Sequence, residues 1–200
     1  MNAIALLNLI ATRFFIYAKI IMMEVFIIAS ITADGLIGQN TDQSSMNWTS
    51  KADKQFFIQK TKEAGAVVMG RKTFDTIAPK YRPLKNRLNI IYTRQNLEDF
   101  IEHYQVQNRE DVLVTQDEPQ KLIQQLEEEG QQQVAICGGS SIYTMFMKAG
   151  VVNKLYLTVE PIVFGSGVKL FNEELDNKLK LNKVGKLGDE GTVLLEYLVG

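Results

Sequence analysis

Cysteine and histidine are almost missing from this sequence. The 200 residues include one cysteine, Cys137, and one histidine, His103. A single cysteine cannot form a disulfide within the chain, which suits a reducing compartment and predicts a cytoplasmic location. Too few Cys and His residues are present for a structural zinc site, and we expect no bound metal. A hydrolase that needs a histidine could use only His103, whose polar neighbours indicate a solvent-exposed side chain.

A surplus of charge of one sign is missing as well. The 22 Lys and Arg residues nearly balance 23 Asp and Glu residues, for a net charge of −1. Nucleic-acid-binding proteins normally carry a basic surplus, so we expect no nucleic-acid partner. The 46% of hydrophobic and 22% of charged residues are typical of one soluble globular domain. Any chemistry must therefore come from carboxylates, amides, hydroxyls or a bound cofactor.

The first 22 residues are apolar and unlike the rest. Arg13 and Lys19 interrupt them, so they fall short of the run of about 20 apolar residues that spans a membrane. They also lack the basic start and the small-residue cleavage site of a secretory signal. Apolar residues recur at helical spacing from Leu7 to Ile21, which leaves an amphipathic helix open. We expect residues 1–22 to be an apolar extension, residues 23–200 to form the folded domain, and no membrane partner.

From Glu24 on, the pattern alternates between strands and helices without a linker or a repeat. We expect strands at 24–31, 66–69, 88–92, 112–114, 134–137 and 155–159, helices at 50–64, from 71, 117–130 and 139–149, and a terminal hairpin of 178–186 with 192–199. The strands at 88–92 and 112–114 are almost wholly apolar, which indicates burial on both faces. This order predicts an α/β fold with three α-β-α layers, a mostly parallel central sheet of about eight strands and an antiparallel C-terminal edge hairpin.

Three expected strand ends carry residues suited to phosphate. One strand reaches Gly70 and continues into a helix that begins with Arg71 and Lys72, two cations that a helix N-terminus disfavours unless a phosphate neutralises them. A second strand passes through Gly138 and Gly139, and a third ends at Thr93 and Arg94. Each feature alone also fits an ordinary turn. Because ligands bind beyond the carboxyl ends of such strands, the three together are a stronger signal than any one, and the two that carry Arg71, Lys72 and Arg94 favour NADP over NAD.

Asp53 is the most informative acid. Ser50 and Asp53 match a capping box, so the carboxylate could simply accept a backbone N–H. Phe57 and Thr61 follow at four-residue steps on the same helix face, and Trp48 lies just upstream. A carboxylate in such an aromatic-walled cleft could instead bind a ligand and assist proton transfer. The residues alone leave capping and catalysis equally open.

Together these stretches resemble the dihydrofolate reductase family from about Val25 to the C-terminus. The segments that carry the resemblance are residues 28–38 (IASITADGLIG), 46–57 (MNWTSKADKQFF), 69–77 (MGRKTFDTI), 82–87 (RPLKNR), 136–143 (ICGGSSIY) and 156–158 (YLT). Their order and spacing match the family, with Trp48 five residues before Asp53. The resemblance implies hydride transfer from NADPH to C6 of dihydrofolate, a small pterin substrate, in the synthesis of tetrahydrofolate.

The resemblance also implies roles for individual residues. Asp53 would bind the pterin 2-amino group and N3, with the N5 proton arriving through water, in a catalytic group of Met46, Trp48, Asp53 and Thr158. Arg87 would bind the glutamate α-carboxylate, and the substrate-binding set is Ile28, Ala29, Phe57, Ile77, Leu84, Arg87, Cys137 and Tyr143. The cofactor-binding set is Ser30, Ile37, Gly70, Arg71, Lys72, Thr73, Thr93, Arg94, Gly138, Gly139, Ser140 and Ser141. Residues 38–48 would form a mobile loop over the nicotinamide, and the Gly138–Gly139 peptide would be cis.

Some positions depart from the family. Asn47 stands where a proline is common, and Ser140 replaces the usual third glycine. Residues 48–50 and 64–67 also resemble the riboflavin-pathway pyrimidine reductases, which share the fold and NADPH. Arg87 favours folate over that alternative, because a ribityl phosphate substrate has no benzoylglutamate to bind. A non-catalytic nucleotide-binding module is the third hypothesis, and a monomer and a homodimer both remain open.

Overall fold

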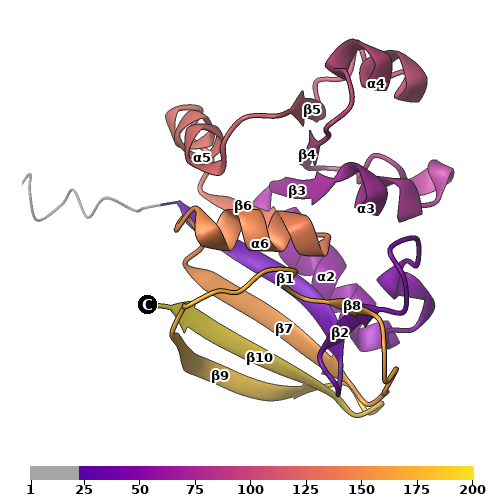
Figure 1. The fold of residues 1–200 in the computed structure, drawn as a ribbon, viewed down its shortest axis with the longest axis vertical. Coiled ribbons are helices and arrows are strands. Elements are labelled where there is room, and N and C mark those ends of the chain that lie inside the picture. The colour runs from indigo at the N-terminus through magenta and orange to yellow at the C-terminus, as the bar shows by residue number, and fades with distance from the viewer. Residues whose placement is uncertain (1–22) are drawn as a thin grey trace, which may run out of the picture.

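The computed structural model describes residues 23–200, so the expectation for residues 1–22 lies outside the described part. Its main sheet has eight strands in the order β5-β4-β3-β6-β1-β7-β10-β9 (Figure 1). The strands are β1 (Glu24–Thr32), β3 (Ala66–Gly70), β4 (Leu88–Tyr92), β5 (Val112–Thr115), β6 (Gln133–Ile136), β7 (Lys154–Glu160), β9 (Leu179–Leu187) and β10 (Thr192–Val199). Neighbours from β5 to β7 pair in parallel, whereas β10 is antiparallel to both β7 and β9. The expected fold class and terminal hairpin are confirmed.

Helices cover both faces of this sheet. They are α2 (Lys51–Ala64), α3 (Arg71–Thr76), α4 (Leu97–Tyr104), α5 (Pro119–Glu128) and α6 (Ser140–Lys148). Side chains of a strand point alternately to opposite faces, so Ile27 packs in a core with α5 and α6, while Phe26 and Ile28 pack in a second core with α2, α3 and α4. Burial on both faces explains why β1 reads as a nearly continuous apolar run. No helix within residues 23–200 is long and apolar enough to span a bilayer.

Three local expectations differ from the structure. Strand β5 lies at the sheet edge, which leaves Leu113 39% exposed, so burial of 112–114 on both faces is wrong. Helix α4 was not expected, although the Asn96 side chain caps it by accepting from the N–H groups of Glu98 and Asp99. The expected mobile loop, residues 38–48, begins within a strand, because Gly38 ends β2 (Leu36–Gly38), which pairs with β8 (Val168–Lys169). His103 is exposed, as expected.

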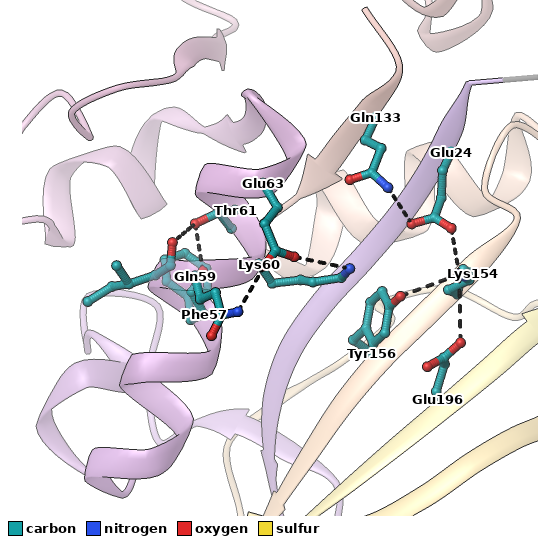
Figure 2. A network of polar contacts seen from close by, with 11 residues as sticks. Glu24, Phe57, Gln59, Lys60, Thr61, Glu63, Gln133, Lys154, Tyr156 and Glu196 are labelled. Atoms are coloured by element: carbon teal, nitrogen blue, oxygen red, sulfur yellow. Dashed lines mark hydrogen bonds and ion pairs between the residues drawn. The ribbon is translucent and has the colours of Figure 1, made fainter.

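The amino ends of the parallel strands carry a paired polar network (Figure 2). The ammonium group of Lys154, at the start of β7, forms ion pairs with Glu24 at the start of β1 and, at 3.6 Å, with Glu196 of β10. It also donates to the Tyr156 hydroxyl at 3.4 Å. Burial opposes the charge, but the hydrogen bonds to Glu24 and Tyr156 outweigh it and raise the pKa of Lys154. This end of the sheet is therefore stabilised without any ligand.

Candidate active site

A cleft of about 1900 Å³ lies at the opposite, carboxyl ends of the strands. Its walls include the ends of β1, β3 and β4 and the segment after β6, which the sheet order brings to one edge. Every predicted site residue lines this cleft except Trp48, Gly138 and Thr158. The strand-end features that lie far apart in the sequence therefore share one cavity.

Asp53 lies in the first turn of α2 and is 3% exposed. Its Oδ1 accepts hydrogen bonds from Ser30 Oγ at 2.8 Å and Thr158 Oγ1 at 2.5 Å, and Ser30 Oγ is also 2.9 Å from Oδ2. Ser30 and Thr158 are register partners on β1 and β7, which brings their hydroxyls side by side. The helix cap comes from Ser50, whose Oγ accepts the Asp53 N–H at 3.1 Å. The capping hypothesis for the Asp53 carboxylate is thus wrong, and that carboxylate faces the cleft.

Arg87 is a second buried charge in the cleft, 8% exposed. Its guanidinium donates to the Thr61 hydroxyl and, at 3.1 Å, to the Lys85 carbonyl. Within residues 23–200 it forms no ion pair with a carboxylate. Burial lowers the pKa of Arg87, but an arginine starts so high that it remains a cation at neutral pH. A buried cation without an acid is costly, so this site is suited to an anionic ligand.

The acid and the cation are held by one helix. Thr61, which accepts from Arg87, lies eight residues after Asp53 on α2 and donates to the Phe57 carbonyl at 2.6 Å (Figure 2). Phe57 stands between them in sequence on the same helix face. Half-buried apolar side chains line the cleft beside these residues, namely Phe57, Ile77 and Leu84. The arrangement is a slot with apolar walls and charged groups of opposite sign.

The backbone carbonyl of Ile28, a predicted substrate-binding residue, already has one hydrogen-bond partner within the protein. The Tyr143 hydroxyl donates to it at 3.0 Å, and Tyr143 is 4% exposed. Burial raises the pKa of Tyr143 well above its usual value, so the phenol remains a neutral donor. Burial also raises the pKa of the Cys137 thiol to about 12. Cys137 is therefore not a thiolate nucleophile, and it can contribute to the cleft through its backbone and its neutral side chain.

Glycines at the end of β3 and just after β6 would allow a ligand in the cleft to approach the backbone closely. A Cβ on Gly70 would lie 3.1 Å from Ile142, and one on Gly139 would lie 3.3 Å from the Thr73 hydroxyl. Gly138 has a φ of +105°, and a Cβ there would lie 2.9 Å from the Tyr143 ring. The Gly138–Gly139 peptide is cis, as the resemblance implies. Any side chain at these positions would fill space next to the cleft.

The cationic residues predicted to bind phosphate differ in whether a carboxylate of the protein already neutralises them. Arg71 pairs with Asp75 at 2.8 Å, so a protein carboxylate takes the place that the sequence argument gave to a phosphate. Lys72 and Arg94 are exposed and have no acid partner among residues 23–200. The buried hydroxyls of Tyr92 and Ser140 line the same part of the cleft and have no hydrogen-bond partner in the described part of the chain. Open cations and unpaired hydroxyls fit the phosphate and ribose groups of a dinucleotide.

Of the two residues predicted to cover the nicotinamide, Met46 lines the cleft and Trp48 does not. Met46 lines the cleft and is 37% exposed. Trp48 does not line it, because its ring packs edge-on against Phe164 at a centroid distance of 5.3 Å. The turn between β1 and β2 is joined to the same β7–β8 loop by the Asp34 carboxylate, which accepts the Gly165 N–H at 2.7 Å. Trp48 thus anchors the covering loop to the β7–β8 loop in this structure.

Sequence reasoning missed two features of the site. Ser30 was expected to contact cofactor, whereas its hydroxyl contacts Asp53. Residues 116–120 line the cleft after β5, and the strand-end rule that found Arg94 could have found them too. The link from Ser30 to Asp53 had no sequence signal, because it depends on which strands are neighbours.

Comparisons with known proteins agree with this geometry. Residues 24–173 match the family model described as dihydrofolate reductase. The chain is similar to the dihydrofolate reductase of Saccharomyces cerevisiae, 30% identical over 111 residues, which cover 51% of this chain and 50% of the yeast protein. The chain thus spans about half the length of that relative.

Solved structures share the fold, and two of them bear on the function. RibD of Acinetobacter baumannii superposes with a TM-score of 0.73 at 20% identity, over 90% of this chain and 59% of that chain. The dihydrofolate reductase of Enterococcus faecalis, complexed with NADP(H) and RAB-propyl, gives 0.65 at 22% identity, over 88% of this chain and 96% of that chain. At these identities the likeness concerns the fold, and the choice of substrate must come from the cleft.

Proposed function

We propose that this chain, which belongs to the dihydrofolate reductase family of oxidoreductases, reduces 7,8-dihydrofolate to 5,6,7,8-tetrahydrofolate with hydride from NADPH. The observation that carries the proposal is the pair of buried charges in one slot, Asp53 and Arg87. The amino and ring N–H donors of a pterin suit a carboxylate, and a glutamate α-carboxylate suits a guanidinium with no acid partner.

The chain's own residues would bind and orient the substrate. Ser30 and Thr158 hold the Asp53 carboxylate by their hydroxyls, so that the acid has a defined direction. The apolar walls would exclude water around the rings and hold them at a fixed distance. When bound, a reduced nicotinamide cofactor supplies the hydride. Lys72 and Arg94 support a preference for the extra phosphate of NADPH, because among residues 23–200 no carboxylate neutralises them.

Reduction of a riboflavin-pathway pyrimidine is the second candidate. It is supported by the fold likeness to RibD, with a TM-score of 0.73. The half-buried walls formed by Phe57, Ile77 and Leu84 favour folate, because they suit an aromatic benzoyl group better than a ribityl polyol. Arg87 could contact an anion in either substrate, so a direct comparison of the two is needed.

The test follows NADPH oxidation by the purified protein with dihydrofolate and, separately, with the deaminated riboflavin intermediate. We expect turnover of dihydrofolate only, and a higher KM for dihydropteroate, which lacks glutamate. Turnover of the riboflavin intermediate alone would overturn the proposal. Binding of NADPH without turnover of either substrate would favour a nucleotide-binding module.

A further inference from the structure

A buried asparagine lies behind the turn that carries Arg87. Asn89, the second residue of β4, is 0% exposed and does not line the cleft. Its Nδ2 donates to the carbonyls of Leu84 and Arg87, each at 2.9 Å, and lies 3.3 Å from the Asp111 carbonyl. Its Oδ1 accepts the Leu84 N–H at 2.9 Å. One side chain therefore holds both ends of the segment of residues 84–87, named here the 84–87 loop.

The chemistry of a primary amide suits this task. An asparagine side chain offers two N–H donors and a carbonyl acceptor, and Asn89 uses all of them on backbone groups. Its oxygen and nitrogen cannot be exchanged, because the groups that face Nδ2 are carbonyls, which only accept. Leu84 pairs with this amide through both its N–H and its carbonyl, as residues of neighbouring strands do. An aliphatic side chain at position 89 would remove all of these hydrogen bonds.

Strand β4 gives this amide a rigid base. Asn89 is a register partner of Val67 on β3 and of Val112 on β5, so strands flank it on both sides. The 84–87 loop itself is a turn outside the helices and strands. Leu84 and Arg87, at its two ends, both line the cleft. Because loops move more easily than strands, the Asn89 amide fixes these two cleft residues relative to the sheet.

The direction of the Arg87 guanidinium depends on the same loop. Its Nε–H donates at 3.1 Å to the carbonyl of Lys85, which lies inside the 84–87 loop. An Nη1–H donates to the Thr61 hydroxyl on α2. These contacts use two of the five N–H groups of the guanidinium, so the remaining ones can face a ligand in the cleft. A displaced loop would therefore turn those N–H groups away from their present direction.

We propose that Asn89 is a positioning residue for Arg87 and, through Arg87, determines the preference for substrates that carry an anionic group. In the proposed substrate, that group is the glutamate α-carboxylate. The choice of dihydrofolate for the test rests on the proposed function, whereas the role of Asn89 in holding the guanidinium does not.

The first experiment uses the ligand-free protein and the variant Asn89→Leu, which has nearly the same size but no polar atoms. NMR of the arginine side chains should show slow hydrogen exchange at the Arg87 Nε–H in wild type, because that group is buried and bonded to Lys85. In Asn89→Leu the exchange should be on the order of tenfold faster, since the loop opens more often. Rapid exchange in wild type, or an unchanged rate in the variant, would overturn the proposal.

The second experiment compares substrates with and without glutamate. Asn89→Leu should raise KM for dihydrofolate on the order of tenfold and leave kcat nearly unchanged, because binding of the tail is the same before and during hydride transfer. KM for dihydropteroate should rise less, since only the Leu84 wall is displaced. In an Arg87→Leu background, Asn89→Leu should no longer affect the two substrates differently. Equal rises for both substrates, or the same difference without Arg87, would contradict the positioning role.

Asn153 provides a matched control at the amino ends of the strands, away from the cleft. Its side chain binds backbone in the same way, because Oδ1 accepts the Val25 N–H at 3.1 Å and Nδ2 donates to the Met23 carbonyl at 3.2 Å. Asn153→Leu should lower Tm, as Asn89→Leu does, and leave the Arg87 exchange rate and the ratio of the two KM values unchanged. If Asn153→Leu changes that ratio equally, lost stability explains the effect and the proposal fails.

The two proposals can fail separately. A wild type that does not reduce dihydrofolate overturns the proposed function, while exchange at the Arg87 Nε–H still decides the role of Asn89. If Asn89→Leu does not fold, Asn89→Ser, which keeps one hydroxyl, replaces it in both experiments. Its changes should be smaller and of the same direction, and no change would again overturn the inference.

Discussion

The two ends of the parallel strands differ in whether their polar groups have partners within the described part of the protein. At the amino ends, Lys154 is paired with both Glu24 and Glu196 (Figure 2). At the carboxyl ends, among residues 23–200, Arg94 has no acid partner, and the buried hydroxyls of Tyr92 and Ser140 have no hydrogen-bond partner. Buried polar groups without partners lower the stability of a fold. We infer from this difference that the amino ends stabilise the protein by themselves, whereas the carboxyl ends are suited to be completed by ligands.

Removing the acid at the ligand end should have the largest effect. Asp53→Asn leaves one acceptor oxygen and no charge, so it cannot hold two pterin donors equally well. We expect kcat with dihydrofolate to fall about 10²–10⁴-fold, the usual range for a lost acid–base group. Cofactor affinity, measured by fluorescence titration, should not change. Undiminished turnover would refute a catalytic role for Asp53.

Removing the buried cation should have the next largest effect. Arg87→Leu should raise KM for dihydrofolate about 10–100-fold with kcat little changed, because a hydrogen bond to a charged group contributes about 1.5–3 kcal/mol. Dihydropteroate should be insensitive to the change. The matched control is Arg82→Leu, since Arg82 lies 3.6 Å from Asp75 and does not line the cleft. Equal losses with both substrates would exclude a contact to glutamate.

The cofactor cations should differ from each other. Arg94→Ala should raise the Kd for NADPH about tenfold and leave the Kd for NADH unchanged, because a charge-assisted contact is lost. Arg71→Ala should have a smaller effect, since Asp75 already neutralises Arg71. Titration of both variants with both cofactors checks this. A larger loss at Arg71 would show that Asp75 releases it when the cofactor binds.

A change at the amino ends of the strands, where Lys154 is paired, should lower stability and leave activity unchanged. Lys154→Met leaves Glu24 and Glu196 without their shared cation and should lower the free energy of unfolding by about 1–2 kcal/mol. The raised pKa of Lys154 means that this stabilisation is present below the ordinary value of 10.5 and is lost as pH rises through the folded value. Urea unfolding and steady-state kinetics measure the two effects. A fall in kcat/KM would contradict the proposal that the amino ends of the strands contribute to stability and not to activity.

The smallest effect should come from removing the contact between Asp34 and the β7–β8 loop. The hydrogen bond from Thr32 and the backbone N–H groups of Phe164 and Gly165 lower the pKa of Asp34. Its stabilising contribution is therefore present above 3.8 and is lost as pH falls through the lower folded value. Asp34→Asn should speed hydrogen exchange at the Gly165 amide near neutral pH and leave global stability nearly unchanged. Unaltered exchange would show that Asp34 does not hold the loop.

The comparison also shows which parts a sequence can predict. Asp53 and Arg87 were found because family spacing and strand-end position are local properties of the chain. Thr158 was placed with Asp53 by the resemblance. The other partners of Asp53 and Ser50 were not found, since Ser30, Glu160 and Thr192 reach them only through the pairing of β1, β7 and β10. Those contacts join residues 23, 110 and 142 positions apart.

Helix α4 is a different case. Apolar or aromatic residues stand at 97, 100, 101 and 104 after Asn96, so helical spacing and a cap were both present in the sequence. The exposure of β5 could not be foreseen, because an edge strand and a central strand can have the same apolar composition.

The contact between Gly138 and Tyr143 sets a rule for redesign of this protein. Tyr143 lies under Gly138 on one side and donates to the Ile28 carbonyl on the other. Adding even a methyl group at 138 would displace the ring and free that carbonyl, so a change intended for the proposed dinucleotide site would alter the wall of the proposed pterin site. Engineers could not retune preference for one ligand without also changing affinity for the second.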